Sequence, residues 1–167
     1  MRRRQRVDPL QRWLRARPRR RDRHQHLEAA RAGKTVAAPA PLQSQALAEQ
    51  VALLAVQAKG TDVQILRVYE LVQYTDFFVI ASGRSDRHVR AIREHVHDAL
   101  KEQKIEPMSV EGVEHNQWVL CDFGAVVLHV FYEPVRDFYQ LERLWNEAPR
   151  VEFDAEALAA EADAEAR

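Results

Sequence analysis

Cysteine is almost absent from this 167-residue sequence, which contains only Cys121. One cysteine excludes an intrachain disulfide and a cysteine-based metal cluster. Because Cys121 ends an apolar run, we interpret it as a buried structural thiol. Apolar runs also stay far below the roughly 20 residues of a membrane-spanning helix, and the N-terminus has no apolar signal-peptide core. We therefore expect a cytoplasmic protein that makes no membrane contact.

A mitochondrial location is the minor alternative, because an Arg-rich leader that is poor in acidic residues is typical of transit peptides. The leader has a single hydroxyl residue, Thr35, before Ser44. That scarcity weakens the transit-peptide interpretation, since such leaders are usually rich in serine.

Catalytic signatures are missing as well. The seven histidines are scattered without the His-Glu-x-x-His spacing of zinc enzymes, and no nucleophile elbow occurs. His129 alternates with the apolar Leu128 and Val130, which indicates a structural histidine. The triplet 122–124, Asp-Phe-Gly, lacks the other protein-kinase motifs and is read as a hairpin turn. We expect no catalytic residues, no metal and no cofactor.

The formal net charge is zero, but the charged residues are distributed unevenly over three parts of the chain. Residues 1–34 carry twelve Arg and one Lys against three acidic residues, whereas residues 35–150 carry eleven basic and sixteen acidic residues. The last seventeen residues carry one basic and six acidic side chains. We expect residues 1–41 to form a disordered Arg-rich arm with a Pro/Ala linker, residues 42–150 to form an α/β domain, and residues 151–167 to form an acidic tail, either a frayed helix or disordered.

The arm has two interpretations, a solvated tail or a segment that contacts phosphate, including that of ribosomal RNA. Leu10, Trp13 and Leu14 have the spacing of a short amphipathic turn.

Hydrophobic periodicity over the remaining chain predicts alternating helices and strands. Residues 76–81 are apolar on both faces, as in the central strand of a covered sheet. Ser44 and Ser85 are suitable N-caps for the two long helices. The predicted helices are residues 44–59, 85–103 and 134–145, and the predicted strands are residues 63–68, 76–81, 107–112, 117–122 and 125–131. This order predicts an α/β fold in which helices pack on a mixed β-sheet.

The loop of Ser82, Gly83, Arg84 and Ser85 lies where a buried strand meets a helix. It is either an ordinary capped helix start or an anion contact, because backbone N–H groups at a helix N-terminus attract phosphate. Nucleotidyltransferases place a small-residue turn at this point and need paired carboxylates on a following strand. The predicted hairpin offers Asp122 alone, so catalytic nucleotidyl transfer is disfavoured.

Trp118 follows a polar loop and begins an apolar strand. Alternation places Trp118 and Leu120 on one face of that strand and Val119 and Cys121 on the other. Trp118 either fills the core or anchors a protein partner, since tryptophan is enriched among interface hot spots.

Two segments carry a resemblance to a known family. Residues 75–92 read TDFFVIASGRSDRHVRAI and residues 109–131 read SVEGVEHNQWVLCDFGAVVLHVF. Together with residues 136–145 they resemble the ribosomal silencing factor (Iojap-like) family over about residues 43–150. The resemblance implies a nucleotidyltransferase-like topology without catalytic carboxylates and without enzyme activity. It also implies that the protein binds the large ribosomal subunit through the fourteenth large-subunit ribosomal protein, blocks joining of the small subunit and represses translation when nutrients are scarce.

The resemblance further implies which residues meet the partner. We expect Trp118, Val119 and Asp122 to lie in or beside the partner surface, with Arg87, His88 and Tyr139 as second choices. Members of the family can be dimeric, so the same face also suits a homodimer. Two departures from the family pattern are Ala125 after the hairpin glycine and Ser109 before Val110.

Two other functions remain open alternatives. One is a nucleotide-dependent enzyme of the nucleotidyltransferase type, which depends on the loop at residues 82–85. The other is general RNA binding, which depends on the arginines of the arm.

Overall fold

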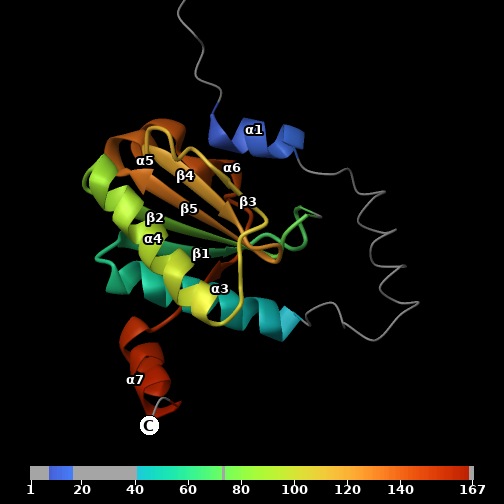
Figure 1. Cartoon of the computed structure of the whole chain (residues 1–167). Coiled ribbons are helices and arrows are strands. Elements are labelled where there is room, and N and C mark those ends of the chain that lie inside the picture. Colours follow the sequence, from blue (N-terminus) through green and yellow to red (C-terminus); the bar gives the residue numbers. More distant parts are fainter. Residues whose placement is uncertain (1–7, 17–40, 73, 166–167) are drawn as a thin grey trace, which may run out of the picture.

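A six-stranded mixed sheet with the order β3-β4-β5-β2-β1-β6 organises the chain. In the computed structural model, which describes residues 8–16, 41–72 and 74–165, β2 (Phe77–Gly83) and β5 (Val126–Tyr132) pair in parallel at its centre, and the other neighbours pair antiparallel (Figure 1). The other strands are β1 (Thr61–Arg67), β3 (Ser109–Glu111), β4 (Trp118–Asp122) and β6 (Arg150–Val151). The helices are α1 (Pro9–Ala16), α3 (Pro41–Gln57), α4 (Asp86–Glu102), α5 (Glu133–Tyr139), α6 (Leu141–Leu144) and α7 (Ala155–Glu165).

Helices cover both faces of the sheet, which confirms the predicted mixed α/β class (Figure 1). Helices α3 and α4 pack one face, where Val119, Cys121 and Leu128 contribute to the core. Helices α1 and α6 contribute to the core on the other face, together with Trp118 and Leu120. The predicted alternation along β4 is therefore confirmed, and every residue of β4 is buried.

Burial explains the behaviour of the single thiol. Cys121 is free and buried, and loss of hydration raises its pKa to about 12. The thiol therefore stays protonated at neutral pH, which confirms the interpretation as a buried structural cysteine.

The junction between β2 and α4 follows the sequence closely. The Ser85 hydroxyl accepts a hydrogen bond from the His88 N–H at 3.1 Å, so Ser85 is the predicted N-cap. Strand β2 continues to Gly83, two residues beyond its expected end. A side-chain carbon at Gly83 would lie 2.9 Å from the Val89 nitrogen, so only glycine allows the helix to approach this closely.

Two helix boundaries differ from the prediction. Helix α3 begins at Pro41, so Ser44 is not its N-cap but lies inside the helix, where its hydroxyl donates to the Asp76 carboxylate at 2.6 Å. The last predicted helix is divided into α5 and α6 because Gln140 has a left-handed backbone with φ of 46°.

Two described segments outside the predicted α/β domain form helices. Residues 9–16 form helix α1 and pack on the sheet, which corrects the prediction of a disordered arm over these residues. The remainder of the predicted arm, residues 1–7 and 17–40, lies outside the described residues. At the start of the acidic tail, β6 pairs with β1, and within the tail α7, the helical alternative, contacts α3. Among the described residues, no helix has both the length and the apolar content that a membrane span needs.

The core packing predicts a large effect for a single truncation at the centre of the sheet. Replacing Leu128, which is fully buried in β5, with alanine should lower the free energy of unfolding by about 2–5 kcal/mol, because methylene burial is lost and a cavity remains. Urea unfolding measures this change. Leu144→Ala is the control, since Leu144 is exposed and its loss should stay within about 0.5 kcal/mol. Equal effects of the two variants would contradict the described core.

Candidate partner-binding surface

Trp118 is the centre of an aromatic cluster at the start of β4. Its ring stacks on Phe131 with centroids 4.7 Å apart, and Tyr139 lies against it at 4.8 Å. The indole N–H donates to Nδ1 of His129 at 3.2 Å, and only 4% of the residue is exposed. Trp118 is therefore a buried support in this structure rather than an exposed anchor. Of the two alternatives for Trp118, a core position and a surface anchor, the packing favours the core position.

Solvent exposure increases from Trp118 through Tyr139 to Phe138. Tyr139 sits at the end of α5 and is partly exposed, and its ring meets Phe138 edge to face at 5.2 Å. Phe138 is 80% exposed. A large apolar ring held this openly beside a packed aromatic cluster is a feature of protein interaction surfaces. Phe138 was not among the expected site residues, although the sequence pair Phe138-Tyr139 was an available signal.

The other expected β4 residues are placed differently. Val119 is fully buried on the opposite face, under the α3 and α4 layer, so it does not share a surface with Trp118. Asp122 lies at the far end of β4 and is 3% exposed. One carboxylate oxygen accepts from the Gly124 N–H at 2.8 Å, and the other accepts from the Trp13 indole at 2.9 Å. Both residues are buried, and only Asp122 remains a candidate for a position beside the surface that contains Trp118; their contact with a partner stays a prediction.

Helix α1 supplies the residue that sequence reasoning missed. Trp13 is 1% exposed, and its ring also meets Tyr74 edge to face at 5.0 Å. Arg12 approaches Glu111 at 3.7 Å and Glu114 at 3.4 Å. Between α1, the segment before β4 and α5 lies a groove of about 250 Å³, whose lining includes Trp118 and Tyr139 as well as residues of α1. The spacing of Leu10 and Trp13 was the signal, but nothing local indicated what they would cover.

Arg87 and His88 do not join this surface. They lie in the first turn of α4, on the other side of the sheet. The His88 ring accepts from the Arg84 N–H at 3.1 Å, and its second nitrogen faces the Ala58 carbonyl at 2.9 Å. His88 therefore ties the start of α4 to the end of α3, and Arg87 is exposed. The structure does not bring these residues together with Trp118 or Tyr139.

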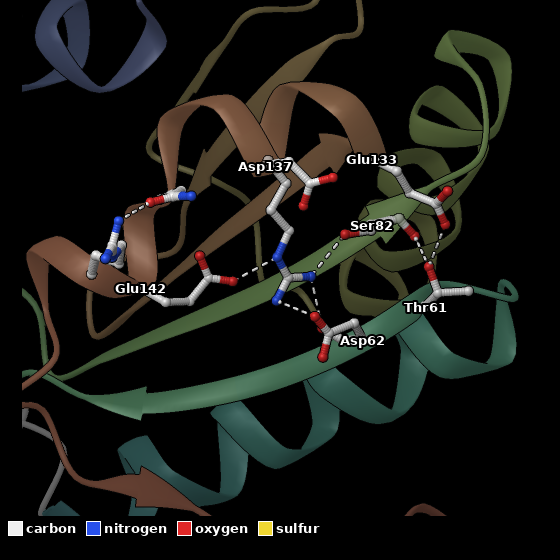
Figure 2. Close-up of a pocket in the computed structure, with 9 residues that line it drawn as sticks. Thr61, Asp62, Ser82, Glu133, Asp137 and Glu142 are labelled. Atoms are coloured by element: carbon white, nitrogen blue, oxygen red, sulfur yellow. Dashed lines mark hydrogen bonds and ion pairs between the residues drawn. The ribbon is translucent and has the colours of Figure 1, made fainter.

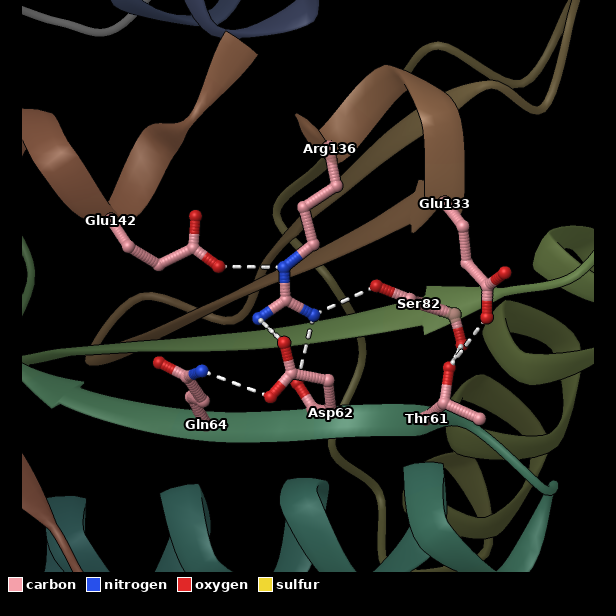
Figure 3. A network of polar contacts seen from close by, with 7 residues as sticks. All are labelled: Thr61, Asp62, Gln64, Ser82, Glu133, Arg136 and Glu142. Carbon is pink, nitrogen blue, oxygen red and sulfur yellow. Dashed lines mark hydrogen bonds and ion pairs between the residues drawn. The ribbon is translucent and has the colours of Figure 1, made fainter. Parts of the chain in front are cut away.

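The loop at residues 82–85 borders a second pocket, of about 460 Å³, shown in Figure 2. Its centre is Arg136, which is buried and donates to Ser82 Oγ at 2.7 Å and to Glu142 at 2.6 Å. Arg136 also pairs with Asp62 at 3.1 Å (Figure 3). Four carboxylates line this pocket: Asp62, Glu133, Asp137 and Glu142. They outnumber the two arginines there, so the electrostatics oppose an anion.

In this fold, the two features that nucleotidyl transfer would need, the loop at residues 82–85 and Asp122, lie apart. Ser82 is in register with Phe131 on β5, whereas Asp122 is opposite Val127. Four residues of strand place these positions about 13 Å apart along the sheet. Asp122 is also occupied by its two donors. Among the described residues, no three His, Cys, Asp or Glu side chains gather as a metal site would require.

Comparison with known proteins decides the family. A family model described as "Ribosomal silencing factor during starvation" matches residues 41–167. The chain belongs to the ribosomal silencing factor family. The ribosomal silencing factor of Halalkalibacterium halodurans is 41% identical over 106 residues, which cover 63% of this chain and 91% of the relative. The Bacillus subtilis silencing factor is 36% identical and covers 58% and 81%. Residues 1–40, with α1, lie outside the family match.

Solved structures agree with this assignment. A crystal structure of a protein from Bacillus halodurans superposes with a TM-score of 0.59 at 37% identity, covering 65% of this chain and 99% of that one. The silencing-factor fold expected from the sequence is thus confirmed, and it places the protein in a family of translation regulators.

The Arg136 network predicts a stability change that is distinct from partner binding. Arg136→Met should lower the free energy of unfolding by about 3 kcal/mol, because Glu142 and Ser82 lose a buried charged partner. Chemical denaturation measures the loss. Arg143→Met is the matched control, since Arg143 lines the same pocket but is exposed and bonds only to Gln140 among the contacts described. A change of similar size in both variants would argue against the network.

His129 makes stability depend on pH. Burial lowers its pKa to about 3, and the hydrogen bond from Trp118 requires an unprotonated Nδ1. Between pH about 6.5, the ordinary histidine pKa, and pH about 3, His129 is protonated in the unfolded chain but neutral in the folded chain. The free energy of unfolding therefore falls as the pH drops through this range. Between pH 7.5 and 5 the loss should be about 2 kcal/mol in urea unfolding.

Two histidine variants test the source of this pH dependence. His129→Gln should flatten the dependence between pH 7.5 and 5, because glutamine does not titrate. His95→Gln, at an exposed position on α4, should leave it unchanged. A flat wild-type profile over this range would show that His129 takes up a proton without unfolding.

Proposed function

We propose that this protein represses translation by binding the large ribosomal subunit and blocking its association with the small subunit. The observation that carries this proposal is the family match, which extends over residues 41–167 and therefore over the whole sheet with α3 to α7. The expected contact is the fourteenth large-subunit ribosomal protein, and the expected condition is nutrient shortage. The family description, which names starvation, supports that condition.

Steric occlusion needs a surface and no chemistry. A standard interface hides about 800 Å² on each partner, which a domain of this size supplies from one side. The aromatic pair Phe138 and Tyr139, supported from below by Trp118, is our candidate for the centre of that interface. Aromatic side chains bury large area with little loss of flexibility, so they dominate binding energy at such centres.

We propose no catalytic step for this surface. Asp122 holds a turn and an indole, Cys121 is a protonated buried thiol, and the pocket around Arg136 is acidic. The alternative of a nucleotidyltransferase-like enzyme depends on the loop at residues 82–85, and that loop borders the acidic pocket. The site of action follows from the partner, so we place the protein with cytoplasmic ribosomes. A mouse relative, 33% identical, is named for mitochondrial assembly of the ribosomal large subunit, which points to the same partner in another compartment.

The aromatic pair gives a direct test. The double variant Phe138→Ala/Tyr139→Ala should weaken co-sedimentation with purified large subunits by about tenfold or more, because hot-spot rings each contribute at least about 1–2 kcal/mol. It should also restore subunit joining in a sucrose gradient. Tyr69→Ala is the matched control, since Tyr69 is exposed in the connection between β1 and β2 at the other end of the sheet.

Three results would count against the proposal. Subunits that join normally with excess wild-type protein would remove the repressor function. Undiminished binding by the double variant would remove the aromatic pair as the contact. If the double variant instead converts a dimer to a monomer while binding large subunits normally, this face serves self-association.

A further inference from the structure

Helix α1 covers part of the face that we assign to the ribosomal partner, although it lies outside the family match. Leu10 and Trp13 are buried in the same hydrophobic cluster as Trp118 and Leu120. Pro9 lies over Gly112, with its Cγ 3.1 Å from where a side-chain carbon of that residue would stand. The groove beside Trp118 is lined on one side by α1 itself. The cluster that supports Tyr139 is therefore closed by a segment of this chain.

The contacts of α1 describe a recognition pattern. An aromatic ring enters an apolar site, its N–H donates to the buried Asp122, and a neighbouring Arg12 faces Glu111 and Glu114. The face thus accepts an aromatic donor preceded by a basic residue, as in Arg12-Trp13. A partner segment that carries an aromatic or apolar side chain beside basic residues fits the same acceptors.

Helix α1 is a short element outside the family match. An isolated helix of eight residues is not stable in water, so α1 keeps its helical form only while it is docked. Twenty-four residues of sequence separate α1 from α3, and a chain of that length spans up to about 80 Å when fully extended. The family model matches residues 41–167 and does not include α1, so the family fold does not require this helix.

We propose that α1 is a cover of the partner-binding face, and that α1 in cis and a basic segment of the large subunit occupy this face alternately. This inference rests on the proposed function. Its physical basis is that Trp118, Asp122 and the two glutamates cannot contact both segments at once. The partner binds only the uncovered fraction of molecules, so the cover reduces the apparent affinity by that fraction.

The test uses the full-length protein with Trp13→Ala, which keeps every arginine of the arm. Removal of the buried indole should release α1 and raise the affinity for purified large subunits by about tenfold, because most molecules are then uncovered. Leu14→Ala is the matched control on the same helix, since Leu14 is 40% exposed, and its affinity should stay within about twofold of wild type. Leu10→Ser removes the second buried contact and should act in the same direction as Trp13→Ala.

Hydrogen exchange of residues 109–122 measures uncovering independently of the ribosome, and exchange should be faster in Trp13→Ala than in Leu14→Ala.

Faster exchange with unchanged or weaker binding would overturn the cover while leaving the proposed function in place. Unchanged exchange would overturn it as well, because α1 would then not protect this face. If no variant binds large subunits, the proposed function itself fails and the cover fails with it. A wild-type dimer that Trp13→Ala converts to a monomer would show that α1 docks on a second copy, which also overturns the cis cover.

Discussion

The parallel pairing of β2 with β5, buried on both faces, is the constraint on which the rest of this molecule depends. A sheet whose central strands have no face open to water must be covered by helices on both sides. Helices α3 and α4 satisfy one side with an aliphatic core. The other side has only the short α5 and α6 from the family region, and the helix α1 completes it. The more thinly covered face is the one that carries the aromatic cluster.

The aromatic cluster extends through packed rings from the core to the surface. Trp118 is held by a stacked ring beneath it and a hydrogen bond to an unprotonated histidine, and it in turn supports Tyr139 and Phe138. Rings positioned in this way lose little freedom when a partner covers them, so the burial of apolar area is converted to affinity with a small entropic cost. A steric repressor requires only this, and the Arg136 network links α5 and α6 to strand β2.

Several features could be read from local sequence because short-range physics determines them. The Ser85 cap, the turn at residues 122–124 and the two-sided partition of β4 depend on a hydroxyl near free N–H groups, a glycine with φ of 87° and the two-residue period of a strand. The family resemblance could also be read from the sequence, because it depends on particular residue types that follow one another in a fixed order. Exposure was harder to predict: the sequence left both a core and a surface position open for Trp118 and placed Asp122 in or beside the partner surface, and both residues are buried.

The amino-acid sequence alone determined strands β1 to β5, the long helices, the mixed sheet and the silencing-factor family, because periodicity and residue order are properties of neighbouring residues. Only the tertiary structure decided that α1 docks on the sheet, that Trp13 reaches Asp122 across 109 positions of sequence, and that Val119 and Arg87 face away from the aromatic surface. The physical reason is that exposure depends on which distant segment packs above a residue. No local pattern of side chains records that segment.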